Sequence, residues 1–434
     1  MDLTVLLVLA ILLALLAIGV HIGIALGLTG ILGIWLTTGT NAATAQIANL
    51  PYSVTAVYSL AVVPLFILMG AFFSRAELTA DLYRACYLWL SRIRGALPIA
   101  TTLAAAGFGA LTGSSVANAA VFARTALPEM VKHGVDKKLA AGCIAAAGTL
   151  AALIPPSLLL VFYGLVTNTS VAALLIAGII PGALTAVIYM VGIYLRVLRK
   201  PELAPRLEIT SPLKERLGSL KPLWGAGLVF LLVTGGIYLG WFTPTQSAAI
   251  GACGALLVAL TRKKFRRSGL WGSLKEAAIT TGTVLLILVG GNFFARFLSY
   301  SGTVRDVSQA LLGWEQPAMV YLLIFIVVMF ILGMFLEAYS SMVLVLPLMV
   351  PILLGAGFDP IWLGVITVKL TEIGLMSPPV GLNVFVVRSS SPIPMRLNDV
   401  FSGVFPFIGL EAVVIALLIA FPSLTLFLPS LMAT

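Results

Sequence analysis

The sequence predicts an all-α membrane protein that crosses the bilayer many times and consists of two inverted-topology repeats. Of its 434 residues, 60% are hydrophobic and only 10% are charged, and residues 3–74, 139–195 and 222–261 contain no Asp, Glu, Lys or Arg. Charge-free stretches of this length cannot cover a globular surface, most of which must contact water. At roughly 20 apolar residues per helix, the chain has room for about ten to twelve spans. This composition excludes a nucleic-acid binder, a secreted disulfide scaffold and a soluble enzyme.

Two basic segments, residues 196–221 and 262–275, set the predicted orientation. The uncharged stretch between them is long enough for two spans, so both segments lie on one side of the membrane. Because basic loops concentrate on the cytoplasmic side, we expect both there, and the net charge of +10 reflects topology. Residues 3–37 are too long for one span and are expected to form two, which places the N-terminus outside.

The first repeat, residues 1–200, is expected to contain a hairpin and a broken span. Residues 95–123 are uncharged and lie between two basic segments, so they either cross twice or enter and return as a helical hairpin. We expect this hairpin at about 95–130, with its tip at Gly113-Ser114-Ser115. The span at about 139–168 is interrupted by Pro155-Pro156. The amphipathic segment 76–94 fits a helix in the membrane interface.

The second repeat, residues 222–434, follows a basic cytoplasmic linker at 201–221 and reproduces the pattern of the first. Its hairpin is expected at about 316–350 and its broken span at about 361–388. Four punctuating features of the first half recur with identical spacing 223 residues later: Pro128, Gly134, Asp136 and Pro155-Pro156 match Pro351, Gly357, Asp359 and Pro378-Pro379.

The two halves are expected to be inverted relative to each other. The loop at 132–138 carries three lysines, whereas the equivalent residues 352–361 carry only Asp359, so the two loops should face opposite sides. Five spans and one hairpin per half give an odd number of crossings, which produces this inversion. Inverted repeats with broken helices are typical of secondary transporters.

The helix breaks and hairpin tips predict where the chemistry lies. A Pro-Pro break inside a membrane frees carbonyl groups that can bind a cation and exposes helix N-termini that favour anions. The alternative is that the prolines only kink their helices and the small residues only allow close packing. Each half places such a break beside a hydroxyl-rich tip: Gly148, Thr149 and Pro155 with Ser114, Ser115 and Asn118, and Thr371, Gly374, Ser377 and Pro379 with Ser340 and Ser341.

Charges at membrane depth are costly and therefore notable. Lys369 and Glu372 are three residues apart and could pair on one helical face, and Glu337 precedes the second Ser-Ser tip. For these three residues, structural pairing and a role in transport both stay open. Glu411 in the last span has no assigned role. Chemistry on a substrate is not expected, because the chain has no P-loop, no HExxH motif and only two isolated histidines.

Several motifs resemble the large membrane subunit of the tripartite ATP-independent periplasmic (TRAP) transporters. The likeness runs over nearly the whole chain, in the same order. Two departures are Gln246, where the family usually has Glu, and Ser377, where Thr is commoner. The segments that carry the resemblance are Gly113-Ser114-Ser115-Val116-Ala117-Asn118, Gly148-Thr149-Leu150, Ile154-Pro155-Pro156-Ser157, Ala177-Gly178-Ile179-Ile180-Pro181-Gly182, Gly240-Trp241-Phe242-Thr243-Pro244-Thr245 and Ser377-Pro378-Pro379-Val380-Gly381-Leu382-Asn383.

The resemblance implies a sodium-coupled secondary active importer of small organic anions, mainly carboxylates, with an elevator mechanism. It implies a periplasmic substrate-binding protein, a small four-span membrane subunit on a separate chain, and the cytoplasmic (inner) membrane of a bacterium or archaeon. Two Na⁺ sites are implied at Ser115, Gly148, Thr149 and Pro155, and at Ser341, Thr371, Gly374, Ser377 and Pro379. Substrate contacts are implied at Ser114, Asn118, Ser340 and Asn383.

Three other functions stay open at this point. The first is a stand-alone sodium- or proton-coupled carboxylate symporter of the same architecture, which would act without partners. The second is an intramembrane enzyme that uses Glu337, Lys369 and Glu372. The third is a passive channel, whose flux would not depend on an ion gradient.

Overall fold

The computed structural model describes residues 3–206, 212–262, 265, 267–314 and 316–432. Over these residues the regular secondary structure is entirely helical, which confirms the predicted fold class. Seven described helices are long and apolar enough to cross a membrane: Tyr58–Arg75, Val171–Arg199, Leu213–Tyr238, Gly269–Tyr300, Ala318–Phe335, Ala338–Gly355 and Leu397–Ala420. Five shorter helices are also apolar: Leu3–Ala17, Ile22–Thr38, Ala96–Thr112, Leu158–Thr167 and Pro244–Leu260.

The first half begins with an α-helical pair in the stretch predicted to make two spans. The helices up to the hairpin are α1 (Leu3–Ala17), α2 (Ile22–Thr38), α3 (Thr40–Thr55), the 3-10 turn η1 (Tyr58–Ala61), α4 (Val62–Arg75) and α5 (Leu78–Leu90). The hairpin and the broken helix follow as α6 (Ala96–Thr112), α7 (Ser115–Lys132), α8 (Lys137–Gly148), η2 (Thr149–Ala152) and α9 (Leu158–Thr167). The half ends with α10 (Val171–Ala177) and α11 (Ile179–Arg199).

The second half has the same order of hairpin and broken helix. The predicted linker contains η3 (Pro201–Leu203) and α12 (Leu213–Leu220), and η4 (Lys221–Leu223) lies at its end. The second half then begins with α13 (Trp224–Tyr238), α14 (Pro244–Leu260), α15 (Arg267–Tyr300) and α16 (Thr303–Leu312). It continues with α17 (Ala318–Phe335), α18 (Ala338–Gly355), α19 (Pro360–Met376), α20 (Leu382–Ser390), α21 (Leu397–Ala420) and α22 (Ser423–Ser430). The domain boundaries at residues 200 and 222 stay a prediction.

Local sequence explains where the site-forming helices begin and end. Gly113 ends α6 with φ 62°, a left-handed conformation that glycine adopts without a steric penalty. A Cβ at Gly113 would lie 2.5 Å from the carbonyl oxygen of Pro156, so the hairpin tip packs directly on the break before α9. At α14, Thr243 and Gln246 form a capping box, which shows that Gln246 serves the same local role as a glutamate there.

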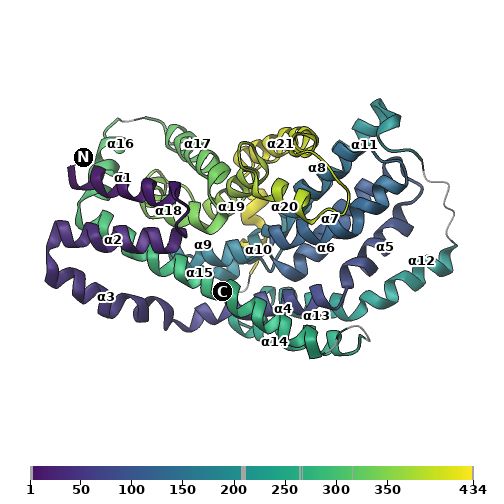
Figure 1. The fold of residues 1–434 in the computed structure, drawn as a ribbon, viewed down its shortest axis with the longest axis horizontal. Coiled ribbons are helices and arrows are strands. Elements are labelled where there is room, and N and C mark those ends of the chain that lie inside the picture. The colour runs from purple at the N-terminus through teal and green to yellow at the C-terminus, as the bar shows by residue number, and fades with distance from the viewer. Residues whose placement is uncertain (1–2, 207–211, 263–264, 266, 315, 433–434) are drawn as a thin grey trace.

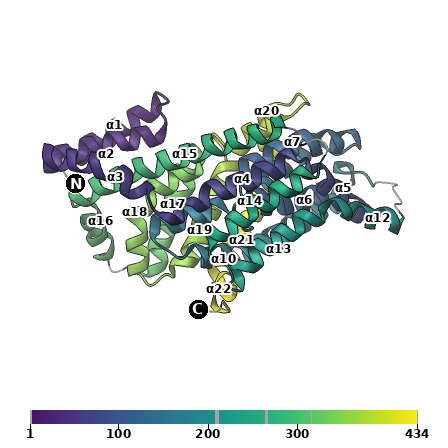
Figure 2. The same cartoon turned by 90° about the horizontal axis from the view of Figure 1, so that it is seen from below.

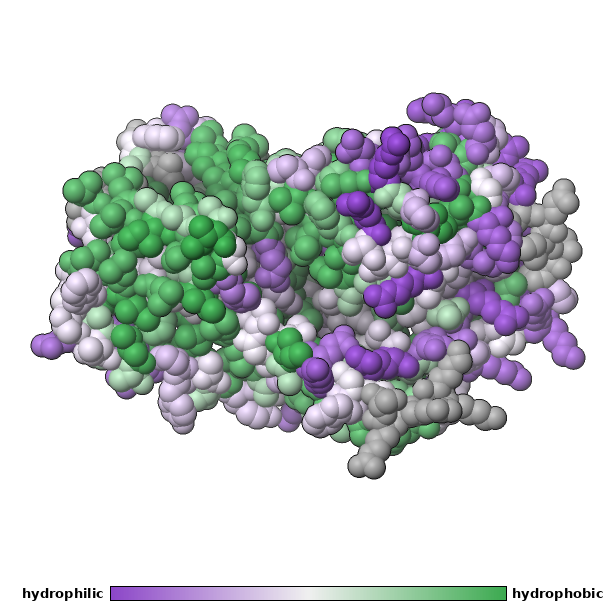
Figure 3. Space-filling model, in the orientation of Figure 1, coloured by the Kyte–Doolittle hydropathy of each residue, from purple (hydrophilic) through white to green (hydrophobic). Residues whose placement is uncertain are grey.

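The helices form an elongated molecule in which the site-forming elements lie together. Figure 1 shows α6, α7 and α8 beside α20 and α21, with α1–α3 and α16 at the opposite end. In Figure 2, α15 runs along much of the length of the molecule, beside α2 and α4. Figure 3 shows hydrophilic side chains gathered toward the end that holds α5, α11 and α12, whereas the face over α1, α2 and α17 is mostly apolar. An apolar face of this kind suits contact with lipid.

Helix α21 packs on α8 through a backbone contact that only glycine permits. A Cβ at Gly142 would lie 2.2 Å from the carbonyl carbon and oxygen of Gly403, and a Cβ at Gly403 would lie 1.9 Å from the carbonyl oxygen of Lys138. Small residues at helix contacts allow backbones to approach closely in membranes. This contact sets the position of α21 against the first broken helix.

We therefore expect Gly142→Ala to lower the free energy of unfolding by about 1–3 kcal/mol, because the added methyl group meets backbone atoms that cannot rotate away. The readout is the thermal midpoint of the purified protein in detergent. Gly227→Ala on α13 is the matched control, since Gly227 is exposed and an added methyl group there would have no other atom within 4 Å. Equal midpoints for both variants would contradict the close packing of α8 and α21.

Candidate functional site

A cavity of about 430 Å³ lies where the two hairpin tips and the two helix breaks meet. The first hairpin contributes Thr112 to Ala117, and the second contributes Glu337 to Tyr339. The broken helices contribute Leu158 and Leu159 at the start of α9, Glu372 and Leu375 on α19, and Leu382 at the start of α20. Elements that are far apart in the sequence therefore build one chamber.

Four helices begin at this cavity. The cavity lining includes a first-turn or capping residue from each of the helices α7, α9, α18 and α20. Ser114 Oγ accepts a hydrogen bond from Ala117 N at 3.4 Å, and Ser157 Oγ accepts one from Leu160 N at 3.2 Å. The first N–H groups of a helix have no partner within the helix, and the helix dipole is positive at this end. The cavity is therefore suited to a carboxylate or another small anion.

The structure brings most of the first predicted Na⁺ cluster together. Asn118 Nδ2 donates to the carbonyl oxygens of Ala105 at 2.9 Å and Gly148 at 3.5 Å. A Cβ at Gly148 would lie 3.1 Å from the carbonyl oxygen of Ser115, so these two backbones are adjacent. Thr149 directly follows Gly148, and its hydroxyl donates to the Ala146 carbonyl at 2.7 Å.

Pro155, the remaining member of the first cluster, is buried in the segment between η2 and α9. In the second predicted cluster, Ser341 lies on α18 and the other members lie on α19 or shortly after it. Gly374 packs against α17, where its Cβ would lie 2.4 Å from the carbonyl carbon of Gly333. Pro379 is exposed. The hydroxyl groups of the other three members donate to carbonyls of their own helices: Ser341 to Ala338 at 2.9 Å, Thr371 to Thr367 at 2.8 Å and Ser377 to Ile373 at 2.6 Å.

The predicted substrate residues fall in two groups. Ser114 lines the cavity, and Ser340 lies in the first turn of α18, where its hydroxyl donates to Glu337 Oε2 at 3.3 Å. Asn118 and Asn383 are fully buried beside the lining. Within the described part of the chain, Asn118 Oδ1 and both polar atoms of the Asn383 amide have no hydrogen-bond partner.

Lys369 pairs with a different carboxylate from the one suggested by the sequence. Lys369 is structurally paired, one of the two possibilities left open by the sequence, but its partner is not Glu372: the Lys369 ammonium binds Glu411 of α21, and Tyr189 of α11 donates its hydroxyl to the other oxygen of Glu411. Lys369 and Glu411 are at most 1% exposed. Sequence analysis did not find this pairing because Lys369 and Glu411 are far apart along the chain. A signal did exist, because Tyr189 and Glu411 are 222 residues apart, close to the 223-residue offset of the repeat.

Glu372 reaches across to the first hairpin. Its Oε1 accepts a hydrogen bond from Ser115 Oγ at 2.6 Å, although these residues are 257 positions apart. The carboxylate of Glu372 is 1% exposed and lines the cavity. Sequence reasoning placed Ser115 and Glu372 in separate clusters, whereas the structure joins them at one wall of the chamber.

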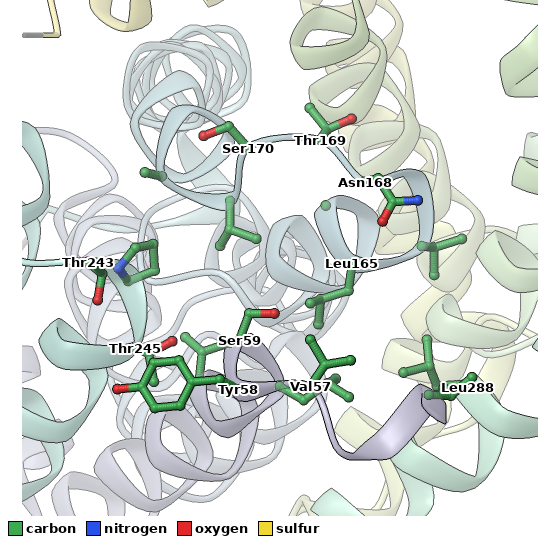
Figure 4. A pocket seen from close by; sticks show the side chains of 18 of the residues that line it. Val57, Tyr58, Ser59, Leu165, Asn168, Thr169, Ser170, Thr243, Thr245 and Leu288 are labelled. Carbon is green, nitrogen blue, oxygen red and sulfur yellow. The ribbon is translucent and has the colours of Figure 1, made fainter. Parts of the chain in front are cut away.

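A second, larger cavity of about 670 Å³ lies elsewhere, between η1, the loop from α9 to α10, and the start of α14. Figure 4 shows Tyr58 and Ser59 on one side and Asn168, Thr169 and Ser170 of the loop on another. No carboxylate and no basic side chain lines this cavity among the described residues. It contains none of the predicted site residues.

The buried cluster of Lys369, Glu411 and Tyr189 predicts a large stability effect. We expect Glu411→Gln to lower the free energy of unfolding by about 3–5 kcal/mol, because the Lys369 ammonium loses its counterion in an apolar interior. Thermal midpoints in detergent measure this. The control is Glu215→Gln, whose partner Arg84 lies 3.5 Å away in an exposed pair that contributes at most about 1 kcal/mol. Similar losses for both variants would show that the buried pair has no special role.

Comparison with known proteins assigns this chain to a family. Residues 9–424 match the family model described as "Tripartite ATP-independent periplasmic transporter, DctM component". The chain is 36% identical over 382 residues to the C4-dicarboxylate TRAP transporter large permease protein DctM of Pseudomonas aeruginosa, covering 86% of each chain. It is 30% identical over 378 residues to the sialic acid TRAP transporter large permease protein SiaM of Vibrio cholerae, covering 86% of this chain and 87% of the relative.

The crystal structure of the Alcanivorax borkumensis YdaH transporter has a similar fold, with a TM-score of 0.61 over 98% of this chain and 100% of that one. At 14% sequence identity this likeness shows the fold alone. The family match confirms the resemblance found in the sequence and the expectation that the chain is not an enzyme. The chain belongs to the DctM component family, the large permease subunits of tripartite ATP-independent periplasmic transporters.

Proposed function

We propose that this subunit is a sodium-coupled importer of small organic carboxylates, which pass through the cavity between the two hairpin tips. The observation that carries the proposal is the meeting of the N-termini of α7, α9, α18 and α20 at one chamber. At α7 and α9, whose caps Ser114 and Ser157 carry no charge, the first N–H groups and the positive dipole ends favour a carboxylate. The two relatives described above are named for C4-dicarboxylates and for sialic acid, which supports a carboxylate as the common feature.

Sodium is proposed to bind at the helix breaks, next to this chamber. A hard cation prefers oxygen ligands from carbonyls, amides and hydroxyls. The residues around α8 fit this requirement. Asn118 donates through Nδ2 to the Gly148 carbonyl, and its Oδ1 is buried without a hydrogen-bond partner in the described chain. Asn383 offers a similar free amide oxygen at the start of α20. Both asparagines, which the resemblance implied as substrate contacts, are therefore proposed as sodium ligands instead. Bound sodium would supply positive charge that attracts the substrate carboxylate.

The hairpins and broken helices are proposed to move together as an elevator. Two interactions favour a single moving body: Ser115 of α7 bonds Glu372 of α19, and Lys369 of α19 bonds Glu411 of α21. The first joins a helix of the first repeat to a helix of the second, and the second joins the broken helix of the second repeat to its last long helix. Helices α1–α4 and α13–α15 are proposed as the static scaffold.

The proposed assembly has three components. A periplasmic binding protein delivers the substrate, and a small four-span membrane subunit accompanies this chain. The chain is a multi-pass membrane protein, and we propose the cytoplasmic (inner) membrane as its location, with the N-terminus outside. The word "tripartite" in the family description supports the three-component arrangement.

The proposal predicts sodium-driven uptake of a carboxylate into proteoliposomes that contain this chain, the small subunit and the binding protein. We expect uptake to stop when K⁺ replaces the inward Na⁺ gradient. Ser115→Ala and Ser341→Ala should each slow uptake by about tenfold or more, the effect of losing one oxygen ligand or hydrogen bond. Ser299→Ala is the control, because Ser299 is exposed on α15 and bonds only its own helix, at Ala295 O.

Two results would overturn parts of this proposal. Uptake by this chain without partners would identify it as a stand-alone symporter. Uptake that is equally fast with no ion gradient would identify a passive channel. If both serine variants transport as fast as Ser299→Ala, the proposed ion sites are wrong even if uptake depends on Na⁺.

A further inference from the structure

We propose that the transported carboxylate also carries a positive charge, so that the substrate is a zwitterion whose ammonium or other organic cation is held by Glu337, Glu372 and Tyr339. This inference rests on the proposed function, because it concerns the same cavity and names the class of substrate. It follows from the charges in the cavity wall, which a dicarboxylate would not complement.

The charged residues of the cavity wall are all acidic. Its described lining contains Glu276, Glu337 and Glu372 and no lysine or arginine. Glu276 lies at a distance of 3.0 Å from the Arg75 guanidinium, so its charge is already matched. The remaining two carboxylates, Glu337 and Glu372, face the same chamber without a basic side chain beside them in the lining.

Glu372 keeps one oxygen free for a ligand. Its Oε1 accepts the hydrogen bond from Ser115, whereas its Oε2 is buried and has no hydrogen-bond partner among the described residues. Leaving a carboxylate oxygen buried and unpaired is costly. The nearest cation along the helix, Lys369, is bonded to Glu411. Because Lys369 is engaged by Glu411, the free oxygen of Glu372 is open to a ligand in the cavity.

Glu337 contributes the second free carboxylate. It occupies the N-cap position of α18 and is partly buried, and Ser340 donates to its Oε2 at 3.3 Å. Within the part of the chain that the structure describes, Glu337 forms no ion pair. Its negative charge offsets the positive end of α18, so that helix has less attraction for a second anion.

Tyr339 adds an aromatic ring to the same wall. The ring lines the cavity and contacts Phe162 in a T-shaped arrangement, with ring centroids 5.0 Å apart. Aromatic rings attract organic cations through the negative charge of their faces, and quaternary ammonium ligands are commonly recognised in this way.

The cavity therefore offers both kinds of group. The N-termini of α7 and α9 suit the carboxylate, since their caps Ser114 and Ser157 carry no charge. Glu337, Glu372 and Tyr339 suit a cation. A dicarboxylate would place its second carboxylate beside these two acidic side chains, and carboxylates at close range repel one another. A zwitterion satisfies both sets of groups at once.

Succinate and β-alanine make a matched test, because β-alanine has an ammonium group where succinate has its second carboxylate. Each compound is titrated against the purified chain in detergent at constant Na⁺. The experiment measures the concentration at which the rise in thermal midpoint is half-maximal. We expect β-alanine to act at a concentration about tenfold or more below that of succinate. Glycine betaine tests the aromatic contact: it should stabilise the wild type and Tyr339→Phe, but not Tyr339→Leu.

Glu337→Gln and Glu372→Gln should each reduce the preference for β-alanine over succinate by about tenfold. Because Glu372 is buried and Glu372→Gln can fail to fold, Glu337→Gln alone suffices for the test. Glu129→Gln is the control, since Glu129 lies near the other end of α7 with Lys132 at 3.9 Å. This variant should prefer β-alanine over succinate as strongly as the wild type does.

The proposal is overturned if succinate stabilises the wild type at an equal or lower concentration than β-alanine, which would mean that sodium ions neutralise Glu337 and Glu372. That result would leave the proposed carboxylate importer intact. It is also overturned if Glu337→Gln retains the full preference for β-alanine. If none of the three compounds raises the thermal midpoint, the zwitterion proposal is also contradicted. Sodium-driven uptake in proteoliposomes then decides separately whether the proposed function holds.

Discussion

The lack of water inside a membrane is the constraint on which this structure depends. A helix that breaks at membrane depth leaves N–H and carbonyl groups without partners, and these must be matched within the protein. Here the breaks before α9 and α20 and the tips before α7 and α18 open onto one cavity. Concentrating the unmatched groups in one chamber turns a cost of folding into a cavity suited to a small anion.

Much of the fold could be predicted from the sequence because apolar runs, prolines and basic loops act locally. The tip at Gly113 and Ser114 and the breaks at Pro155-Pro156 and Pro378-Pro379 all lie between helices in the structure, since paired prolines, and a glycine followed by a serine cap, end helices through local geometry. Single prolines such as Pro128 and Pro351 lie inside helices instead. The same local rules indicated Ser114 and Ser115 as residues near the site.

The pairing of buried charges could not be predicted, because it depends on which helices become neighbours. Lys369 has Glu372 three residues away in sequence but bonds Glu411, since the close contact of Gly142 with Gly403 brings α21 against the broken helices. Glu372 is then left to bond Ser115. These long-range contacts decide which carboxyl groups are left without a basic partner at the cavity wall.

The central claim is that transport uses the smaller cavity at the helix N-termini and not the larger one between η1 and α14. Single cysteines test it most directly, at Ala120 in the smaller cavity and Val57 in the larger one, with the exposed Cys253 changed to Ser. With Na⁺ and substrate at ten times its Kd, thiol labelling of Ala120→Cys should slow by about tenfold, and labelling of Val57→Cys should not change. Protection of Val57→Cys alone would contradict the account.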